Sequence, residues 1–128
     1  MSAKTLIIDD DELSVMLTSI AIKDSPFSTE IETYLDALQA LEDFRMNYST
    51  SHKYLIFLDL NMPMMNGWEF LEEIKSFVST HNTFIFILSS STDKEDISKA
   101  NKNELVRKFY SKPIEGDHIA EISKIIKK

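Results

Sequence analysis

The fold is decided by residues 54–59, which read Tyr-Leu-Ile-Phe-Leu-Asp. A short, unbroken apolar run is typical of a strand covered on both faces, which is how strands lie in a parallel sheet. The same design recurs at residues 5–8, which lead into Asp9, and at residues 84–88, which lead into Ser89. Three such runs predict the buried centre of a parallel β-sheet.

Two weaker strands and a set of helical patterns complete the chain. Residues 28–35 alternate less cleanly, as a strand near the sheet edge does, and residues 105–110 predict a last strand. Apolar residues recur at helical spacing after the strands, and the clearest sets are Leu13, Met16, Leu17 and Ile20, then Trp68, Leu71, Ile74 and Val78, then Ile119, Ile122, Ile125 and Ile126. Strand and helix alternate five times, which predicts an α/β fold with a doubly wound, five-stranded parallel sheet.

Composition limits the class of protein. The 128 residues suffice for one domain, so we expect a single domain over residues 1–128. A net charge of −7 disfavours binding to nucleic acid, and the lack of cysteine excludes disulfides and thiolate metal sites. Because the longest apolar runs are too short to span a membrane, we expect a cytoplasmic protein with neither nucleic acid nor membrane as a partner.

Polar side chains stand where the predicted strands end. Asp9 and Asp10 follow the first strand, Asp59 the third, Ser89 the fourth and Lys112 the fifth. In an open parallel sheet of order 2-1-3-4-5, ligands bind beyond the carboxyl ends of the strands, at the switch point between the first and third. We therefore expect these five side chains to share one crevice.

The expected crevice has the chemistry of phosphoryl transfer. Three crowded carboxylates repel one another, and a divalent cation such as Mg²⁺, which prefers oxygen ligands, relieves that repulsion. A lysine and a serine hydroxyl suit the oxygens of a phosphoryl group, and an aspartate can act as the nucleophile. Taken singly, each acid is more often a helix cap or a surface charge, so the inference rests on the joint pattern.

The same residues resemble the receiver, or phosphoacceptor, domain of two-component response regulators. The matching stretches are residues 6–11, residues 58–63 with Asn66-Gly67 after them, residues 88–90 and residues 111–114. The intervals match as well, with 30 residues from Asp59 to Ser89 and 23 more to Lys112. The resemblance covers the whole chain and implies a flavodoxin-like receiver fold with the sheet order 2-1-3-4-5.

The resemblance implies a role for each acid. Asp59 would accept a phosphoryl group from a phosphohistidine on a histidine kinase or a histidine phosphotransfer protein. Mg²⁺ would be held by Asp9, Asp10, Asp59 and the backbone carbonyl of Asn61, while the side chains of Asn61 and Ser91 would tune the lifetime of the phosphoryl group. The protein would catalyse only its own phosphorylation and dephosphorylation, and so would not be an enzyme with other substrates.

Three further positions would form a switch. Lys112 would pair with the phosphoryl oxygens, the Ser89 hydroxyl would turn toward them, and the ring of Phe109 would swing inward. The resemblance also implies a cis peptide bond between Lys112 and Pro113. Without the resemblance, Phe109 is also consistent with a plain core residue.

We expect a stand-alone response regulator without an output domain, because one receiver uses all 128 residues. It would signal to an unknown downstream protein through the face of the fourth helix, fifth strand and fifth helix, as a monomer or a weak, phosphorylation-linked dimer. Two alternatives stay open. A Mg²⁺-dependent aspartyl-phosphate phosphatase would need an acid where Asn61 stands, and a receiver-like module that binds partners without phosphorylation would not need the intact site.

Overall fold

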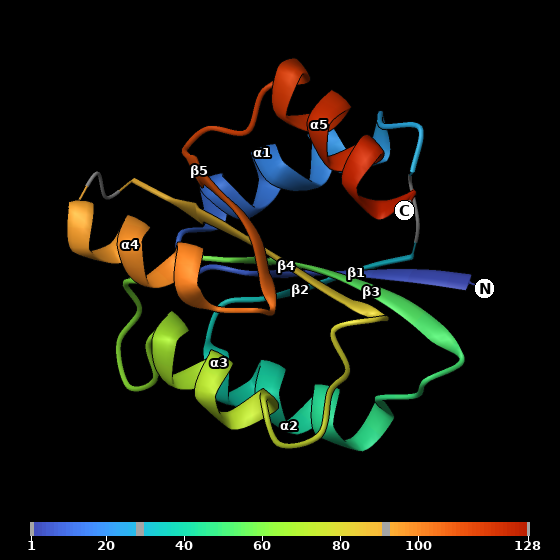
Figure 1. Cartoon of the computed structure of the whole chain (residues 1–128). Coiled ribbons are helices and arrows are strands. Elements are labelled where there is room, and N and C mark those ends of the chain that lie inside the picture. The colour runs from blue at the N-terminus through green and yellow to red at the C-terminus, as the bar shows by residue number, and fades with distance from the viewer. Residues whose placement is uncertain (1, 28–29, 91–92, 128) are drawn as a thin grey trace.

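The computed structural model describes residues 2–27, 30–90 and 93–127. Strands and helices alternate along this part of the chain (Figure 1). They are β1 (Ser2–Ile8), α1 (Glu12–Lys23), β2 (Glu30–Tyr34), α2 (Ala37–Asn47), β3 (His52–Leu58), α3 (Gly67–Ile74), β4 (Thr83–Ser89), α4 (Lys94–Lys102), β5 (Val106–Ser111) and α5 (Gly116–Ile126). The strands are parallel and pair in the order β2-β1-β3-β4-β5, which confirms the predicted sheet. Residues 28 and 29 of the predicted edge strand lie outside the described residues.

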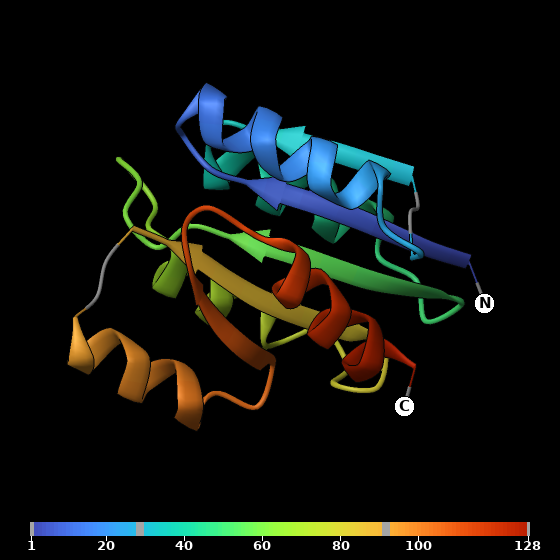
Figure 2. The same ribbon diagram turned by 90° about the horizontal axis from the view of Figure 1, so that it is seen from above.

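Helices cover both faces of the sheet. In Figure 1, α1 and α5 lie above the sheet, and α2 and α3 lie below it. Helix α4 lies beside β5 at one edge, and Figure 2 shows the same placement from above. None of the helices in the described ranges is long and apolar enough to cross a membrane.

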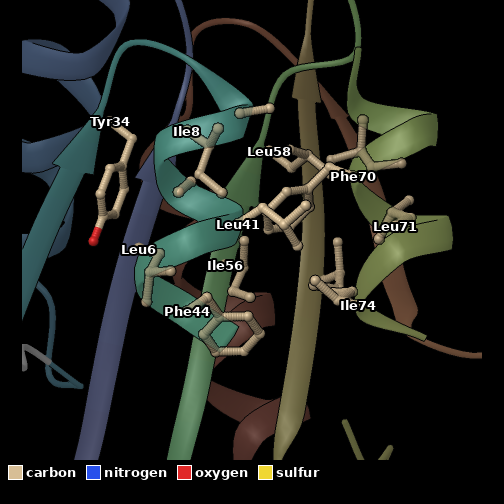
Figure 3. Close-up of a cluster of buried hydrophobic side chains, with 14 of the residues drawn as sticks. Leu6, Ile8, Tyr34, Leu41, Phe44, Ile56, Leu58, Phe70, Leu71 and Ile74 are labelled. Atoms are coloured by element: carbon tan, nitrogen blue, oxygen red, sulfur yellow. The ribbon is translucent and has the colours of Figure 1, made fainter. Parts of the chain in front are cut away.

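The position of β3 in the sheet explains why its apolar run is unbroken. Leu55 and Phe57 pack on the side of α1 and α5, whereas Ile56 and Leu58 pack on the side of α2 and α3. Alternate side chains of a strand point to opposite faces, so a strand covered on both faces must be apolar throughout. Figure 3 shows one of the two clusters, in which side chains of α2 and α3 such as Phe70 lie against the central strands.

Helix α1 begins where predicted, but its apolar stripe faces solvent. The side chain of Asp11 caps the helix. The apolar stripe consists of four side chains that are each between 45% and 58% exposed: Leu13, Met16, Leu17 and Ile20. The buried side of the helix is formed instead by Val15, Thr18 and Ile22. The helical spacing thus located the helix, but it did not identify the side that packs on the sheet.

Two element boundaries differ from expectation. The last strand begins at Val106, because Leu105 lies in a turn where its backbone N–H donates to the Asn103 side chain at 2.9 Å. The third helix ends at Ile74, so Val78 packs against the core from the following loop. Both residues still bury apolar surface, which is why the sequence pattern included them.

Candidate functional site

Two buried aspartates lie side by side at the carboxyl ends of β1 and β3. The strand register sets Ile8 opposite Leu58, and the backbone N–H of Asp59 donates to the Ile8 carbonyl at 2.9 Å. Asp9 is 4% exposed and Asp59 is 6% exposed, whereas Asp10 lies at the surface. Carboxylate oxygens from these three residues lie within 4.8 Å of one another. The fold therefore brings together the acids that the sequence placed at one edge of the sheet.

Lys112 reaches the same acids from the end of β5. Its Nζ lies 2.6 Å from Oδ2 of Asp9 and 3.5 Å from Oδ2 of Asp59. The backbone N–H of Lys112 donates to the Ser89 carbonyl at 2.9 Å, so the pairing of β4 with β5 fixes its position. The peptide bond between Lys112 and Pro113 is cis. One ammonium group thus faces two buried carboxylates, which leaves an excess of negative charge.

Burial and the excess of negative charge shift the pKa values of Asp59 and Lys112. Burial, and after it the charge of Asp9, raise the pKa of Asp59 to about 6, although Lys112 and the backbone N–H groups of Asn61 and Leu60 act in the opposite direction. Burial lowers the pKa of Lys112, but its hydrogen bond with Asp9 and the charges of Asp59 and Asp9 outweigh burial and raise it. The cluster therefore disfavours the ionised form of Asp59. A divalent cation is suited to relieve the repulsion between the carboxylates.

The other predicted site residues lie on the strands and loops around the acids. Ser89 is fully buried at the end of β4. Asn61 is exposed in the loop after β3, and Phe109 on β5 is half-buried against the core beneath α2 and α3. Ser91 lies outside the described residues. Ser89 and Phe109 thus belong to the two neighbouring strands that also position Lys112.

A close backbone contact explains why glycine stands at the start of α3. The backbone N–H of Gly67 donates to the Leu60 carbonyl at 2.9 Å, and Asn66 and Glu69 form a capping box around it. A Cβ atom on Gly67 would lie 2.6 Å from the carbonyl oxygen of Asp59. The sequence indicated a turn at Asn66-Gly67, but this steric requirement beside Asp59 appears only in the folded chain.

Replacing Gly67 with alanine is expected to lower the free energy of unfolding by about 1–3 kcal/mol, because the new methyl group must displace the backbone of Asp59. Gly116→Ala is the matched control, since a Cβ atom there meets nothing within 4 Å. Urea unfolding of both variants measures the difference. Equal stability of the two variants would show that the contact at Gly67 is unimportant.

An apolar surface borders the site. A cleft of about 280 Å³ lies beside Lys112, between the start of α1 and the residues that follow β5. Leu13 and Leu17 of the apolar stripe line it together with Pro113 and Ile114. Exposed apolar side chains that gather next to polar, reactive groups are typical of a surface that a partner covers.

Comparison with known proteins gives a consistent picture. The family model of the response regulator receiver domain matches residues 5–124. The chain is 27% identical over 111 residues to the probable methanogenesis regulatory protein FilR2 of Methanothrix harundinacea, which covers 85% of this chain and 71% of that protein. It is 32% identical over 130 residues to the hybrid signal transduction histidine kinase L of Dictyostelium discoideum, which covers 98% of this chain but only 7% of the kinase.

A solved structure supports the same comparison over nearly the whole chain. The two-component response regulator from Cytophaga hutchinsonii superposes with a TM-score of 0.88 and is 26% identical in sequence. The match covers 98% of this chain and 96% of that one. The fold described above therefore has a counterpart among solved structures.

Proposed function

Because this chain belongs to the response regulator receiver domain family, we propose that it is the phosphoacceptor of a cytoplasmic two-component phosphorelay. Asp59 takes a phosphoryl group from a phosphohistidine on a histidine kinase or a histidine phosphotransfer protein. One observation carries the proposal: the buried carboxylate of Asp59 lies 3.5 Å from Nζ of Lys112, with two further acids beside it.

The acid cluster fits Mg²⁺. Asp9, Asp10 and Asp59 offer carboxylate oxygens within 4.8 Å of one another. The backbone carbonyl of Asn61 would supply a further ligand. Hard divalent cations prefer such oxygen ligands, and the surplus negative charge of the cluster attracts them. When bound, the ion neutralises charge on the acids and on the phosphoryl oxygens.

In the transfer step, a carboxylate oxygen of Asp59 attacks phosphorus while the bond between phosphorus and the donor histidine nitrogen breaks. The electron pair of that bond returns to the ring nitrogen. The ring leaves as neutral imidazole when its other nitrogen already carries a proton, and otherwise it takes up one proton from water as it leaves. The N–H groups of Leu60 and Asn61 donate to Asp59 and hold it in place. Lys112, whose Nζ lies 3.5 Å from Asp59, pairs with an oxygen of the incoming group and stabilises its charge together with the metal.

Ser89 and Phe109 couple phosphorylation to a change of surface. The phosphoryl group adds about −1.5 to −2 charge and new acceptor oxygens next to the buried end of β4, where the Ser89 hydroxyl can donate to them. Phe109 is only half-buried, so its ring would bury more apolar surface by moving inward. The face formed by α4, β5 and α5 is the output surface that contacts a downstream protein. The side chains of Asn61 and Ser91 tune the lifetime of the phosphoryl group.

The site residues count against both alternative functions. A phosphatase that works through an aspartyl-phosphate needs a general acid two residues after the nucleophile, where this chain has Asn61. An amide cannot give a proton to the leaving group. A module that binds without phosphorylation has no use for Lys112 beside two buried acids, since burying charges is costly.

Incubation with acetyl phosphate and Mg²⁺ is expected to add one phosphate per chain, because a small donor reaches Asp59 without docking. Removing Mg²⁺ with EDTA is expected to reduce the labelled fraction to background. Intact mass at low pH measures both. No added phosphate with Mg²⁺ present would overturn the proposal in favour of a phosphorylation-independent module, and sustained hydrolysis of a phosphate monoester would favour a phosphatase.

The apolar stripe of α1 is the surface on which we place the phosphohistidine donor. It lies beside the cleft at Lys112, so a protein seated there brings its own reactive group to the mouth of the site. Apolar side chains that are half exposed at this place are covered when the donor docks. The stripe thus supplies affinity, while the acid cluster supplies the chemistry.

Leu17→Glu is expected to slow phosphotransfer from the donor protein by about tenfold or more, because it puts a charge at the centre of an apolar contact. Labelling by acetyl phosphate should not change. Met46→Glu on α2, where the side chain is 84% exposed, is the control and should leave both reactions intact. The donor is chosen as the kinase that labels the wild-type protein fastest. If Leu17→Glu slows labelling by acetyl phosphate as much as phosphotransfer from the donor protein, the defect lies in the site rather than in docking.

A further inference from the structure

A second hollow of the molecule lies between α3 and α4. Its volume is about 700 Å³, which is within the usual range of small-molecule sites. Side chains of α3, of α4 and of the loops that follow them line it. Leu71 and Leu105 are buried and give it an apolar floor. This groove shares no lining residue with the acid cluster and so is a separate feature.

The indole of Trp68 forms one wall of the α3–α4 groove, and two contacts from α4 hold it. Its Nε1 donates to Oδ1 of Asp96 at 3.1 Å, and Nζ of Lys99 lies 4.7 Å from the ring centroid. An aromatic side chain that is fixed in this way, and still half exposed, is a ready platform for a second flat ring. Trp68 is also the only tryptophan in the chain.

The lining of the groove has one more lysine than acidic side chains, although the chain as a whole has a net charge of −7. Three lysines and two glutamates line it, and Glu72 already pairs with Lys75 at 3.9 Å. On α4, Lys99 and Lys102 are three residues apart and therefore lie on the same side of the helix. Lys102 makes no ion pair with any described residue. The α4 rim can therefore give two ammonium groups to one anion.

We propose that the α3–α4 groove binds a small aromatic phosphate of the nucleoside monophosphate class. The base stacks beside Trp68 over the apolar floor, and the phosphate pairs with Lys99 and Lys102. This site is a second one, and it does not rest on the phosphoacceptor function proposed above. A ligand in it bridges α3 to α4, and α4 on its own buries only Ala100 among its residues.

The test uses AMP and GMP as separate probes, with the fluorescence of Trp68 as the signal. Each nucleotide is expected to give a saturable change after correction against free N-acetyltryptophanamide. Adenosine and guanosine, which lack the phosphate, are expected to bind about tenfold more weakly. Inorganic phosphate is expected to compete, and bound nucleotide should slow amide hydrogen exchange in α4.

Lys102→Gln is the decisive variant, because Lys102 forms no ion pair within residues 2–27, 30–90 and 93–127 whose loss could disturb the fold. It is expected to weaken nucleotide binding about threefold to tenfold. Lys124→Gln on α5 removes the same charge away from the groove and should bind like the wild type. The proposal is overturned if neither nucleotide saturates below about 10 mM, if nucleosides bind as well as nucleotides, or if the two lysine variants bind equally.

Discussion

Replacing Asp59 with asparagine is expected to stabilise the Mg²⁺-free protein at pH 7 by about 1–3 kcal/mol while it abolishes phosphorylation. Burial and the neighbouring charge of Asp9 raise the pKa of Asp59 from 3.8 to about 6. The ionised carboxylate is therefore less favourable in the folded chain than in the unfolded chain. In the proposed function, the site keeps this unfavourable charge because Asp59 is the group that reacts.

The stability effect has a defined pH window. Well below pH 3.8, Asp59 is protonated in both states, so the wild type and Asp59→Asn should unfold alike, and at pH 4 they should still differ little. Between about pH 3.8 and pH 6, the unfolded chain ionises Asp59 while the folded chain still holds the proton, so the wild type loses stability that the variant keeps, and the difference levels off above pH 6. Asp9, which lies 2.6 Å from Nζ of Lys112, is unchanged in the variant, so the substitution leaves no buried cation without a partner.

Urea unfolding in EDTA at pH 4 and pH 7 measures this difference. Asp24→Asn, at the far end of α1, removes an exposed carboxylate and is the control; it should change stability little at either pH. Two results would show that the acids do not repel one another as described. One is that Asp59→Asn is no more stable than the wild type at pH 7, and the other is that its gain in free energy of unfolding is as large at pH 4 as at pH 7.

Replacing Lys112 with methionine is expected to lower the free energy of unfolding of the Mg²⁺-free protein by about 3–5 kcal/mol. The ammonium group is the counter-ion of Asp9 and Asp59, which are 4% and 6% exposed. Removing it leaves two buried carboxylates without a cation. The rate of labelling by acetyl phosphate should fall about 10²–10³-fold as well, because the charge that meets the phosphoryl oxygens is gone.

Mg²⁺ should rescue the stability of Lys112→Met but not its rate. The metal replaces Lys112 as counter-ion of the acids, so it should stabilise the variant more than the wild type. Lys108→Met, on β5 and paired with Glu121 at 3.7 Å at the surface, is the control. Urea unfolding with and without Mg²⁺, together with intact-mass labelling rates, gives both quantities. Stability equal to that of Lys108→Met in EDTA would contradict the role of Lys112.

Much of the fold could be predicted because burial on both faces forces a continuous apolar strand. Residues 54–58 have this pattern, and β3 lies at the centre of the sheet with β1 and β4 beside it. Parallel pairing then places the residues that follow the strands at one edge. Asp9, Asp59 and Lys112 meet there for that reason, without any contact having to be known in advance.

The sequence could not reveal contacts that depend on how elements pack. In α1, helical spacing is visible in Leu13 and Leu17, but the side against the sheet includes Thr18, which no apolar pattern would choose. The loop after β3 turns so that Gly67 lies against the backbone of Asp59, where a Cβ atom would not fit. The spacing of residues in the sequence does not show this contact. Trp68 likewise acquires its partners from α4, a helix that is distant in sequence.

The most direct test of the central claim is to locate the phosphate. The protein is labelled with acetyl phosphate and Mg²⁺, digested at low pH and analysed by fragment mass spectrometry, with Asp59→Asn in parallel. The account predicts one phosphate per chain, carried by Asp59 and sensitive to hydroxylamine as an acyl phosphate is, and none on the variant. Phosphate on Asp9, on Asp10 or on a serine, or equal labelling of Asp59→Asn, would contradict it.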